Sequence, residues 1–142
     1  MIIYVDGGAR GNPGPAAIGF VVFDESHTEL HRFGTAIGKR TNNYAEYSAL
    51  IEALTYLTAK NSNTETVSST NRTTIYSDSE LIVRQMNGEY KVKDPKLIPL
   101  HRKAQGLMKQ IEAVHIHHIR RNENSIADSI VNRVLDNRPI TG

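Results

Sequence analysis

Cysteine is absent from this chain of 142 residues, and its absence excludes three kinds of chemistry. Without a thiol the protein has no disulfide framework, no cysteine nucleophile and no thiolate ligand for a metal ion. Long apolar runs are absent too, because the longest of them, such as residues 18–23, are far too short to span a bilayer. We therefore expect no association with a membrane.

The beginning and the composition of the chain bear on its compartment and its size. The sequence enters a strand-like apolar run at residues 2–5, with no basic leader and cleavage site before it. Together with the lack of cysteine, this favours a cytoplasmic protein. A hydrophobic content of 39%, without repeats or linkers, predicts one domain over residues 1–142. We expect a monomer that needs no obligate protein partner.

Charge is unevenly distributed along the chain. The formal net charge is only +2, yet residues 84–121 hold nine Lys or Arg against three acidic residues. A basic region joined to an acidic site is the electrostatic pattern of a protein that binds a polyanion. An ordinary solvated surface explains the same residues equally well.

The pattern of apolar residues predicts five strands and four helices. The strands are expected at residues 1–5, 17–23, 30–37, 74–77 and 114–119. The helices are expected at about residues 47–58, 79–86, 95–111, where Pro99 interrupts the helix early, and 125–135. Residues 7–15, rich in Gly and Pro, predict a long turn, and the polar residues 61–74 predict a mobile loop. The order βββαβααβα predicts an α/β fold with a five-stranded mixed sheet flanked by helices.

Four carboxylates stand at the ends of predicted elements: Asp6, Glu46, Asp78 and Asp128. Each has an ordinary structural explanation. Asp6 precedes two glycines and can be a turn former. Glu46 lies three residues after Asn43, and Asp128 three after Ser125, as in capping boxes. Asp78 directly precedes a helix, as an N-cap does.

Their joint placement favours a shared site instead. Asp6 and Asp78 close two strands that we expect to be adjacent and parallel, and ligands bind outside the carboxyl ends of such strands. Glu46 and Asp128 open helices whose ends can meet the same edge. Four crowded anions repel one another without cations, and hard oxygen ligands favour Mg²⁺ or Mn²⁺ over zinc. Two such ions about 3.5–4 Å apart form a known clamp for phosphoryl displacement.

Four segments carry a family resemblance: YVDGGARGNPGP at residues 4–15, TNNYAEY at 41–47, YSDS at 76–79 and NSIAD at 124–128. In this order they resemble the motifs of the ribonuclease H type 1 family, and they span nearly the whole chain. The resemblance implies a ribonuclease H-like fold. It also implies hydrolysis of the RNA strand of RNA–DNA hybrids, which leaves 5′-phosphate and 3′-hydroxyl ends.

The resemblance assigns roles to particular residues. It implies that the four carboxylates are catalytic and hold two Mg²⁺ ions, with Mn²⁺ as a substitute, one to activate the attacking water and one to stabilise the leaving oxygen. It also implies that the first loop and the Asn-Asn turn contact the 2′-hydroxyls of the RNA. The substrate-binding candidates are Gly7, Gly8, Ala9, Asn12, Thr41 (for a DNA phosphate), Asn42, Asn43 and Arg121. Turn and cap roles remain the alternative for Asn12, Thr41 and Asn43.

The chain also departs from the family pattern. The loop before the last helix lacks the His of some members, and Arg121 is the candidate for its role. Glu80 stands where many relatives have Gln, and Arg84 can neutralise it as an i, i+4 pair. The Trp-rich basic protrusion of some members is not present, and we expect residues 90–96 to supply a smaller basic contact to the DNA strand. We also expect no N-terminal hybrid-binding domain.

Three other functions remain open at this point. The first is a binding module that has lost catalysis, although all four carboxylates are present. The second is a DNA-directed or integrase-like nuclease, which the loop that reads 2′-hydroxyls argues against. The third is a small-molecule phosphatase, for whose compact pocket the sequence gives no specific sign.

Overall fold

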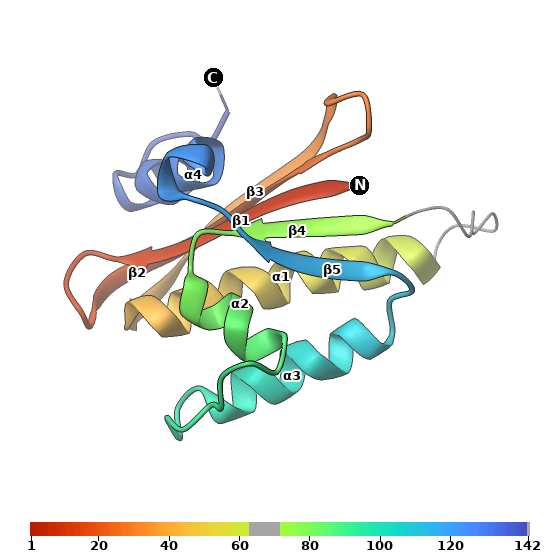
Figure 1. The fold of residues 1–142 in the computed structure, drawn as a ribbon. Helices are drawn as coiled ribbons and strands as arrows, with labels where there is room; N and C mark the ends of the chain where they lie inside the picture. Colours follow the sequence, from red (N-terminus) through yellow and green to blue (C-terminus); the bar gives the residue numbers. More distant parts are fainter. Residues whose placement is uncertain (63–71, 142) are drawn as a thin grey trace.

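A five-stranded sheet carries the fold, with its strands in the order β3-β2-β1-β4-β5 (Figure 1). The strands are β1 (Ile2–Ala9), β2 (Gly14–Phe23), β3 (Glu29–Arg40), β4 (Thr73–Ser77) and β5 (Val114–His118). The first three pair antiparallel, whereas β1, β4 and β5 run parallel, so the sheet is mixed as predicted. The structure, a computed structural model, describes residues 1–62 and 72–141, with the backbone alone at 61 and 62.

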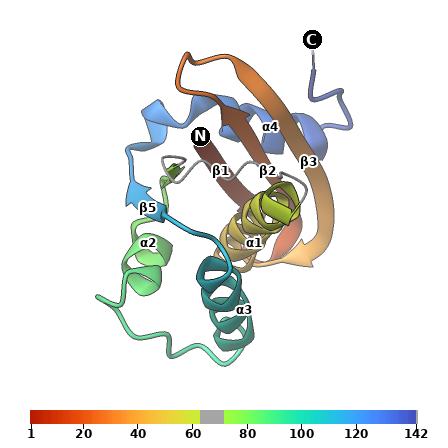
Figure 2. The ribbon, with the colours of Figure 1, turned by 90° about the vertical axis from the view of Figure 1, so that its right-hand side faces the viewer.

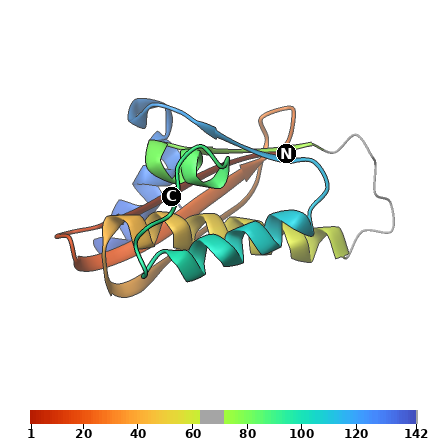
Figure 3. The same ribbon diagram turned by 60° about the horizontal axis from the view of Figure 1, so that its bottom comes forward.

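Helices cover both faces of this sheet. They are α1 (Asn42–Ser62), α2 (Glu80–Met86), α3 (Ile98–Lys109) and α4 (Ser125–Leu135), and the short η1 (Arg121–Glu123) precedes α4. Figures 2 and 3 show α1 and α3 packed against each other on one face, while α4 lies on the other. The predicted element order is therefore confirmed. In the described part of the chain, no helix has both the length and the apolar character needed to cross a bilayer.

The main core lies between the sheet and α1. The predicted apolar stripe of this helix is buried: Tyr47, Leu50, Ile51, Leu54 and Leu57. On the sheet side, Ile3 and Val5 of β1 are buried in the same cluster, because alternate residues of a strand point to the same face. Each such fully buried aliphatic side chain contributes about 1.5–3 kcal/mol through the hydrophobic effect. This packing holds the first turn of α1 at a fixed height above β1.

The predicted long turn at residues 7–15 is wrong in its extent. β1 continues through Gly7 and Gly8 to Ala9, paired with residues 16–18 of β2, and only residues 10–13 form the turn. Glycine is permitted in a ladder because pairing uses the backbone alone, and the hydrogen bond from Arg10 N to the Pro15 oxygen closes the hairpin. Asp6 is therefore an internal residue of β1 rather than its last one.

Two further boundaries differ from the prediction. Pro99 lies in the first turn of α3, which begins at Ile98, and does not interrupt the helix, because a missing backbone N–H there costs no intrahelical bond. The predicted loop at residues 61–74 is shorter, because α1 reaches residue 62 and β4 begins at Thr73. Its middle, residues 63–71, lies outside the described residues.

Candidate active site

The parallel pairing of β1 and β4 brings two carboxylates to one edge. The last residue pair in this ladder joins Val5 to Ser77, so Asp6 and Asp78 each follow it directly. Glu46 reaches the same place from the first turns of α1. One carboxylate oxygen from each of these three residues lies within 4.8 Å of the others. This arrangement is the convergence that the sequence predicted for the strand ends.

A cavity of about 450 Å³ contains this cluster, and Asp128 of α4 lines it as well. Asp128 does not belong to the tight group of three, so three of the four carboxylates lie close together and the fourth lines the same cavity. Six of the predicted substrate-binding residues also line it: Gly7, Gly8, Ala9, Asn42, Asn43 and Arg121. The structure therefore brings together residues from β1, α1, η1 and α4 and from the segment that follows β4.

Glu46 is fixed by the backbone of β1. Its Oε1 accepts a hydrogen bond from the Gly7 N–H at 2.6 Å. The close approach requires glycine, because a Cβ at position 7 would lie 2.2 Å from the Ala45 carbonyl oxygen. The alternative capping box with Asn43 is not formed, and Thr41 Oγ1 caps the helix by accepting from the Tyr44 N–H at 3.2 Å.

The capping roles that the sequence offered for Asp78 and Asp128 are not realised either. The N-cap of α2 is Ser79, whose side chain accepts from the Ile82 N–H at 3.3 Å, so Asp78 does not cap it. Asp128 makes no capping box with Ser125, and its Oδ2 accepts from Asn132 Nδ2 at 3.3 Å. Neither carboxylate is required by the helix that it precedes or opens.

The electrostatics of the cluster favour cation binding. Burial above all, and then the charges of Asp78 and Asp128, raise the pKa of Asp6 to about 8, while the charge of Arg121 opposes the rise. Burial, Asp6 and Asp78 likewise raise the pKa of Glu46 well above its usual range. A divalent cation offsets both the cost of burying the ionised carboxylates and their mutual repulsion. An all-oxygen donor set fits Mg²⁺ or Mn²⁺.

Comparisons with known proteins agree with this geometry. A family model described as "Reverse transcriptase-like" matches residues 4–134. LC11-RNase H1, solved in complex with RNA/DNA hybrid, is 45% identical with a TM-score of 0.87, and 96% of each chain is covered. RNase H1 from the halophilic archaeon Halobacterium salinarum is 34% identical with a TM-score of 0.84, over 96% of this chain and 97% of that one. The chain belongs to the ribonuclease H type 1 family.

The chain also matches part of a longer protein. The bifunctional protein Rv2228c of Mycobacterium tuberculosis is 40% identical over 137 residues, which are 96% of this chain and 35% of that protein. The chain thus spans about a third of the length of the first curated relatives that it matches. The family resemblance that the four motifs carried is confirmed.

Two predicted substrate residues of this family member lie outside the carboxylate cavity. Asn12 Oδ1 accepts from the Asn42 N–H at 3.0 Å, and Asn42 Oδ1 accepts from the Ala9 N–H at 2.8 Å. Asn12 therefore links the β1–β2 turn to the start of α1, which agrees with the turn role given as its alternative. Thr41, besides capping α1, lines a separate cavity of about 390 Å³ together with Arg40, Tyr44, Asp94 and Lys96.

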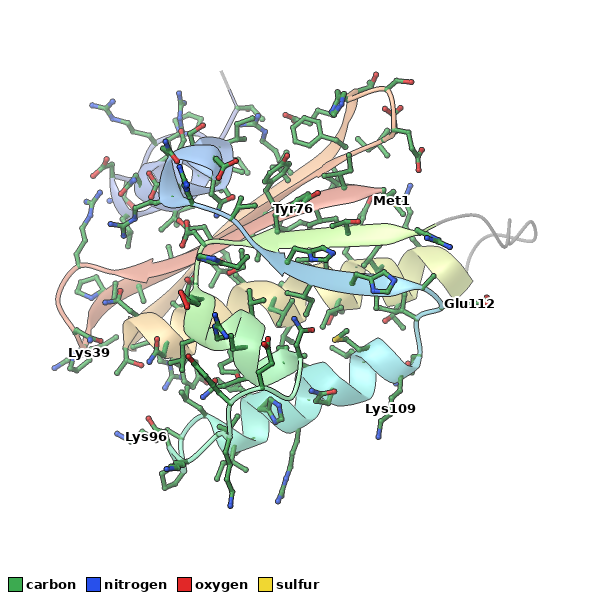
Figure 4. The ribbon with its side chains drawn as sticks, viewed as in Figure 1. Met1, Lys39, Tyr76, Lys96, Lys109 and Glu112 are labelled. Atoms are coloured by element: carbon green, nitrogen blue, oxygen red, sulfur yellow. The ribbon has the colours of Figure 1, made fainter. Side chains whose placement is uncertain are left out.

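This second cavity places part of the basic segment beside α1. The Arg40 guanidinium lies 4.5 Å from the centre of the Tyr44 ring, and Lys96 lines the same hollow. Figure 4 shows Lys96 and Lys39 on the side of the molecule where α1 begins, whereas Lys109 lies at the far end of α3. Of the cations in residues 84–121, Lys96 therefore lies near the beginning of α1, whereas Lys109 is remote from it.

Glu80, which stands where many relatives have Gln, is neutralised by a neighbouring arginine. Arg84 Nε lies 3.1 Å from Glu80 Oε1, which is the predicted i, i+4 pair. The same guanidinium lies 3.5 Å from Glu89 Oε1 and packs over Tyr90. Glu80 is exposed and does not line the carboxylate cavity, so it adds no fifth acid there.

Several residues of the site were missed by the sequence reasoning. Arg10 lines the cavity and forms an ion pair of 2.6 Å with Asp136. Asn124 is buried and donates to Asp78, and Asn132 donates to Asp128. Arg10 and Asn124 lie inside the quoted motifs, so the motifs themselves held the signal. Asn132 follows Asp128 by one helical turn, a spacing that places the two on one helix face.

Proposed function

We propose that this chain hydrolyses the RNA strand of RNA–DNA hybrids by two-metal-ion catalysis and leaves 5′-phosphate and 3′-hydroxyl ends. One observation carries the proposal. A single cavity combines the four carboxylates with the backbone of Gly7, Gly8 and Ala9 and with the Asn42-Asn43 pair. The relation to LC11-RNase H1, which was solved with RNA/DNA hybrid, supports the same substrate.

The metal ligands would be Asp6, Glu46, Asp78 and Asp128. Two Mg²⁺ ions held there, or Mn²⁺ in their place, would supply activation of the attacking water and stabilisation of the leaving 3′ oxygen. The protein's part is to hold four anions in one place before the ions bind. The hydrogen bond from Gly7 to Glu46 and the one from Asn124 to Asp78 do this for two of them.

Substrate discrimination follows from groups that face the cavity. Asn42 uses its Oδ1 to accept from Ala9, so its Nδ2 is the atom left to donate to an RNA 2′-hydroxyl. Gly8 and Ala9 present backbone close to the cavity, where bulky side chains would hold a sugar–phosphate away. Contacts to 2′-hydroxyls distinguish RNA from DNA without reading bases.

Two cationic regions fit the strands of the hybrid. Arg121 is exposed and lines the cavity in a loop without histidine, where a guanidinium can neutralise a phosphate. Thr41, Arg40 and Lys96 surround the neighbouring cavity, which fits a phosphate of the DNA strand.

Cleavage of a labelled RNA–DNA hybrid tests the proposal. The chain is incubated with Mg²⁺, with Mn²⁺ or with a chelator, beside the Asp78→Asn variant and beside duplex DNA and duplex RNA. We expect metal-dependent cutting of the RNA strand of the hybrid, abolished in Asp78→Asn, with 5′-phosphate on the products. Tight binding of the hybrid without cutting under either metal would make the chain a binding module, and preferred cutting of duplex DNA would make it a DNA-directed nuclease.

A further inference from the structure

The side chain of Asn124 joins three elements at the edge of the carboxylate cluster. Asn124 lies between η1 and α4 and is only 1% exposed. Its Nδ2 donates to the Val5 carbonyl oxygen at 2.8 Å and to Asp78 Oδ2 at 3.0 Å. One amide group therefore connects the start of α4, the interior of β1 and the carboxylate that follows β4.

The orientation of this amide is determined by its neighbours. Val5 O and Asp78 Oδ2 are both acceptors, so only the NH₂ end of the side chain can face them. The Oδ1 end is then buried, and it has no hydrogen-bond partner among the described residues. An unsatisfied buried acceptor costs about 1–3 kcal/mol. A residue that served packing alone would not need to carry that cost beside an anionic cluster.

The contact also makes the two carboxylate oxygens of Asp78 different from each other. Oδ2 is held by Asn124, whereas no hydrogen bond within the described residues involves Oδ1. A neutral donor fixes the rotation of the carboxylate and leaves its negative charge in place. A Lys or Arg in the same position would cancel that charge. Oδ1 is thereby left available to a cation, beside the oxygens of Asp6 and Glu46.

We propose that Asn124 is a positioning residue that sets the affinity of the carboxylate site for Mg²⁺. Its amide holds Asp78 in the orientation that metal binding needs, before the ion arrives. The inference rests on the metal assignment of the proposed function and not on the substrate. Partners that orient metal ligands typically change metal affinity or activity about 10- to 100-fold when they are removed.

Calorimetric titration of the substrate-free protein with Mg²⁺, repeated with Mn²⁺, tests this role. Asn124→Leu removes the donor and keeps the branched shape of the side chain at a somewhat larger volume, whereas Asn124→Ala removes both the donor and the volume. We expect Mg²⁺ to bind about 10- to 100-fold more weakly to both variants. Hybrid cleavage should need correspondingly more Mg²⁺ for half-maximal rate, and much of the rate should return at saturating Mg²⁺.

Two other asparagines serve as matched controls. Asn87 Nδ2 donates to the Ile116 carbonyl oxygen at 3.3 Å, outside the cavity, so Asn87→Ala tests loss of a backbone anchor alone. Asn132 donates to Asp128 Oδ2 at 3.3 Å from an exposed position, where water can replace it. We expect unchanged Mg²⁺ affinity for Asn87→Ala, and for Asn132→Ala a loss far smaller than for Asn124→Leu.

The outcomes distinguish a positioning role of Asn124 from a purely structural role. They also test the inference separately from the proposed function. Unchanged Mg²⁺ affinity in folded Asn124→Leu, with only a lower melting temperature, would overturn the inference. Absence of Mg²⁺ and Mn²⁺ binding by the unsubstituted protein would overturn both the inference and the metal assignment. If Mg²⁺ affinity depends on Asn124 but no hybrid is cleaved, the inference stands and the proposed function fails.

Discussion

The Glu46 carboxylate accepts a 2.6 Å hydrogen bond from the backbone N–H of Gly7, across the contact between α1 and β1. This contact ties a catalytic candidate on a helix to the strand that carries another candidate, Asp6. It forms only because β1 and α1 meet without an intervening side chain at position 7, where a Cβ would lie 2.2 Å from the Ala45 oxygen. The position of Glu46 therefore depends on the absence of one methyl group.

Gly7→Ala should displace α1 from β1. Backbone atoms on both sides leave no flexible side chain to yield, and overpacking of this kind costs about 1–3 kcal/mol. Glu46 would move with the helix, so we expect a loss of hybrid cleavage larger than the loss of folded protein. Urea unfolding and cleavage rates measure the two effects. Gly106→Ala on α3 is the control, because a Cβ there meets nothing within 4 Å, and it should stabilise by about 0.5–1 kcal/mol.

The raised pKa of Asp6 predicts how stability depends on pH in the metal-free protein. An Asp in the unfolded chain titrates near 3.9, whereas burial and neighbouring carboxylates raise the pKa of folded Asp6 to about 8. Between these values the folded state binds more protons than the unfolded state, so the free energy of unfolding should fall as pH rises from about 4 to about 8. Chelator-treated protein in urea titrations across this range gives the measurement.

Two comparisons check that Asp6 and its neighbours cause this trend. Asp6→Asn should flatten the dependence of the unfolding free energy on pH. Saturating Mg²⁺ should flatten it too, because the ion replaces the proton, and Mg²⁺ binding at pH 7 should release protons. A metal-free protein whose stability rises steadily from pH 4 to pH 8 would contradict the assignment.

The four carboxylates could be found from the sequence because each follows a pattern with a physical cause. Asp6 and Asp78 end apolar runs that must be buried strands, and parallel strands carry ligands at their carboxyl ends. Glu46 and Asp128 come early in helices whose apolar stripes fix the face that is buried. Their convergence also required that the strands before Asp6 and Asp78 be adjacent and parallel, an expectation that the pairing of β1 with β4 confirms.

Other features depend on contacts that no local pattern records. The extension of β1 through Gly7 and Gly8 follows from pairing with β2, which overrides the usual association of glycine with turns. The role of Asn124 depends on acceptors supplied by Val5 and Asp78, 119 and 46 residues away in the sequence. Asn12 faces Asn42 instead of the cavity because of how the hairpin folds back on α1.

Lys96 and Lys109 should differ in their effect on hybrid binding. Lys96 lines the cavity that contains Thr41, while Lys109 lies at the remote end of α3 (Figure 4). A lysine that contacts a phosphate contributes about one unit to the slope of log affinity against log salt. In an Asp78→Asn background, which prevents cleavage, we expect Lys96→Ala to weaken binding of the hybrid and to make this slope less steep. An equal effect of Lys109→Ala would show that general charge, not the cavity, attracts the hybrid.

Arg121 should act on the chemistry more than on binding. It lines the carboxylate cavity and lowers the pKa of both Asp6 and Glu46 by its charge, so its removal favours their protonated forms. Arg121→Ala should reduce the cleavage rate at saturating hybrid about 10-fold, because the cavity loses a cation that can neutralise a phosphate. Mg²⁺ should bind at least as tightly as before, because the ion is no longer repelled by the guanidinium.

Arg120 provides the comparison for this prediction, because it is the adjacent arginine and is exposed but does not line the cavity. Arg120→Ala changes the net charge of the loop by the same amount and should leave the cleavage rate at saturating hybrid nearly unchanged. Arg121→Lys separates charge from shape, since it keeps the cation but loses the planar fork that binds phosphate through two parallel hydrogen bonds. If Lys at position 121 does not restore the rate, the planar guanidinium contacts the substrate; if it restores the rate, the charge alone accounts for the effect of Arg121.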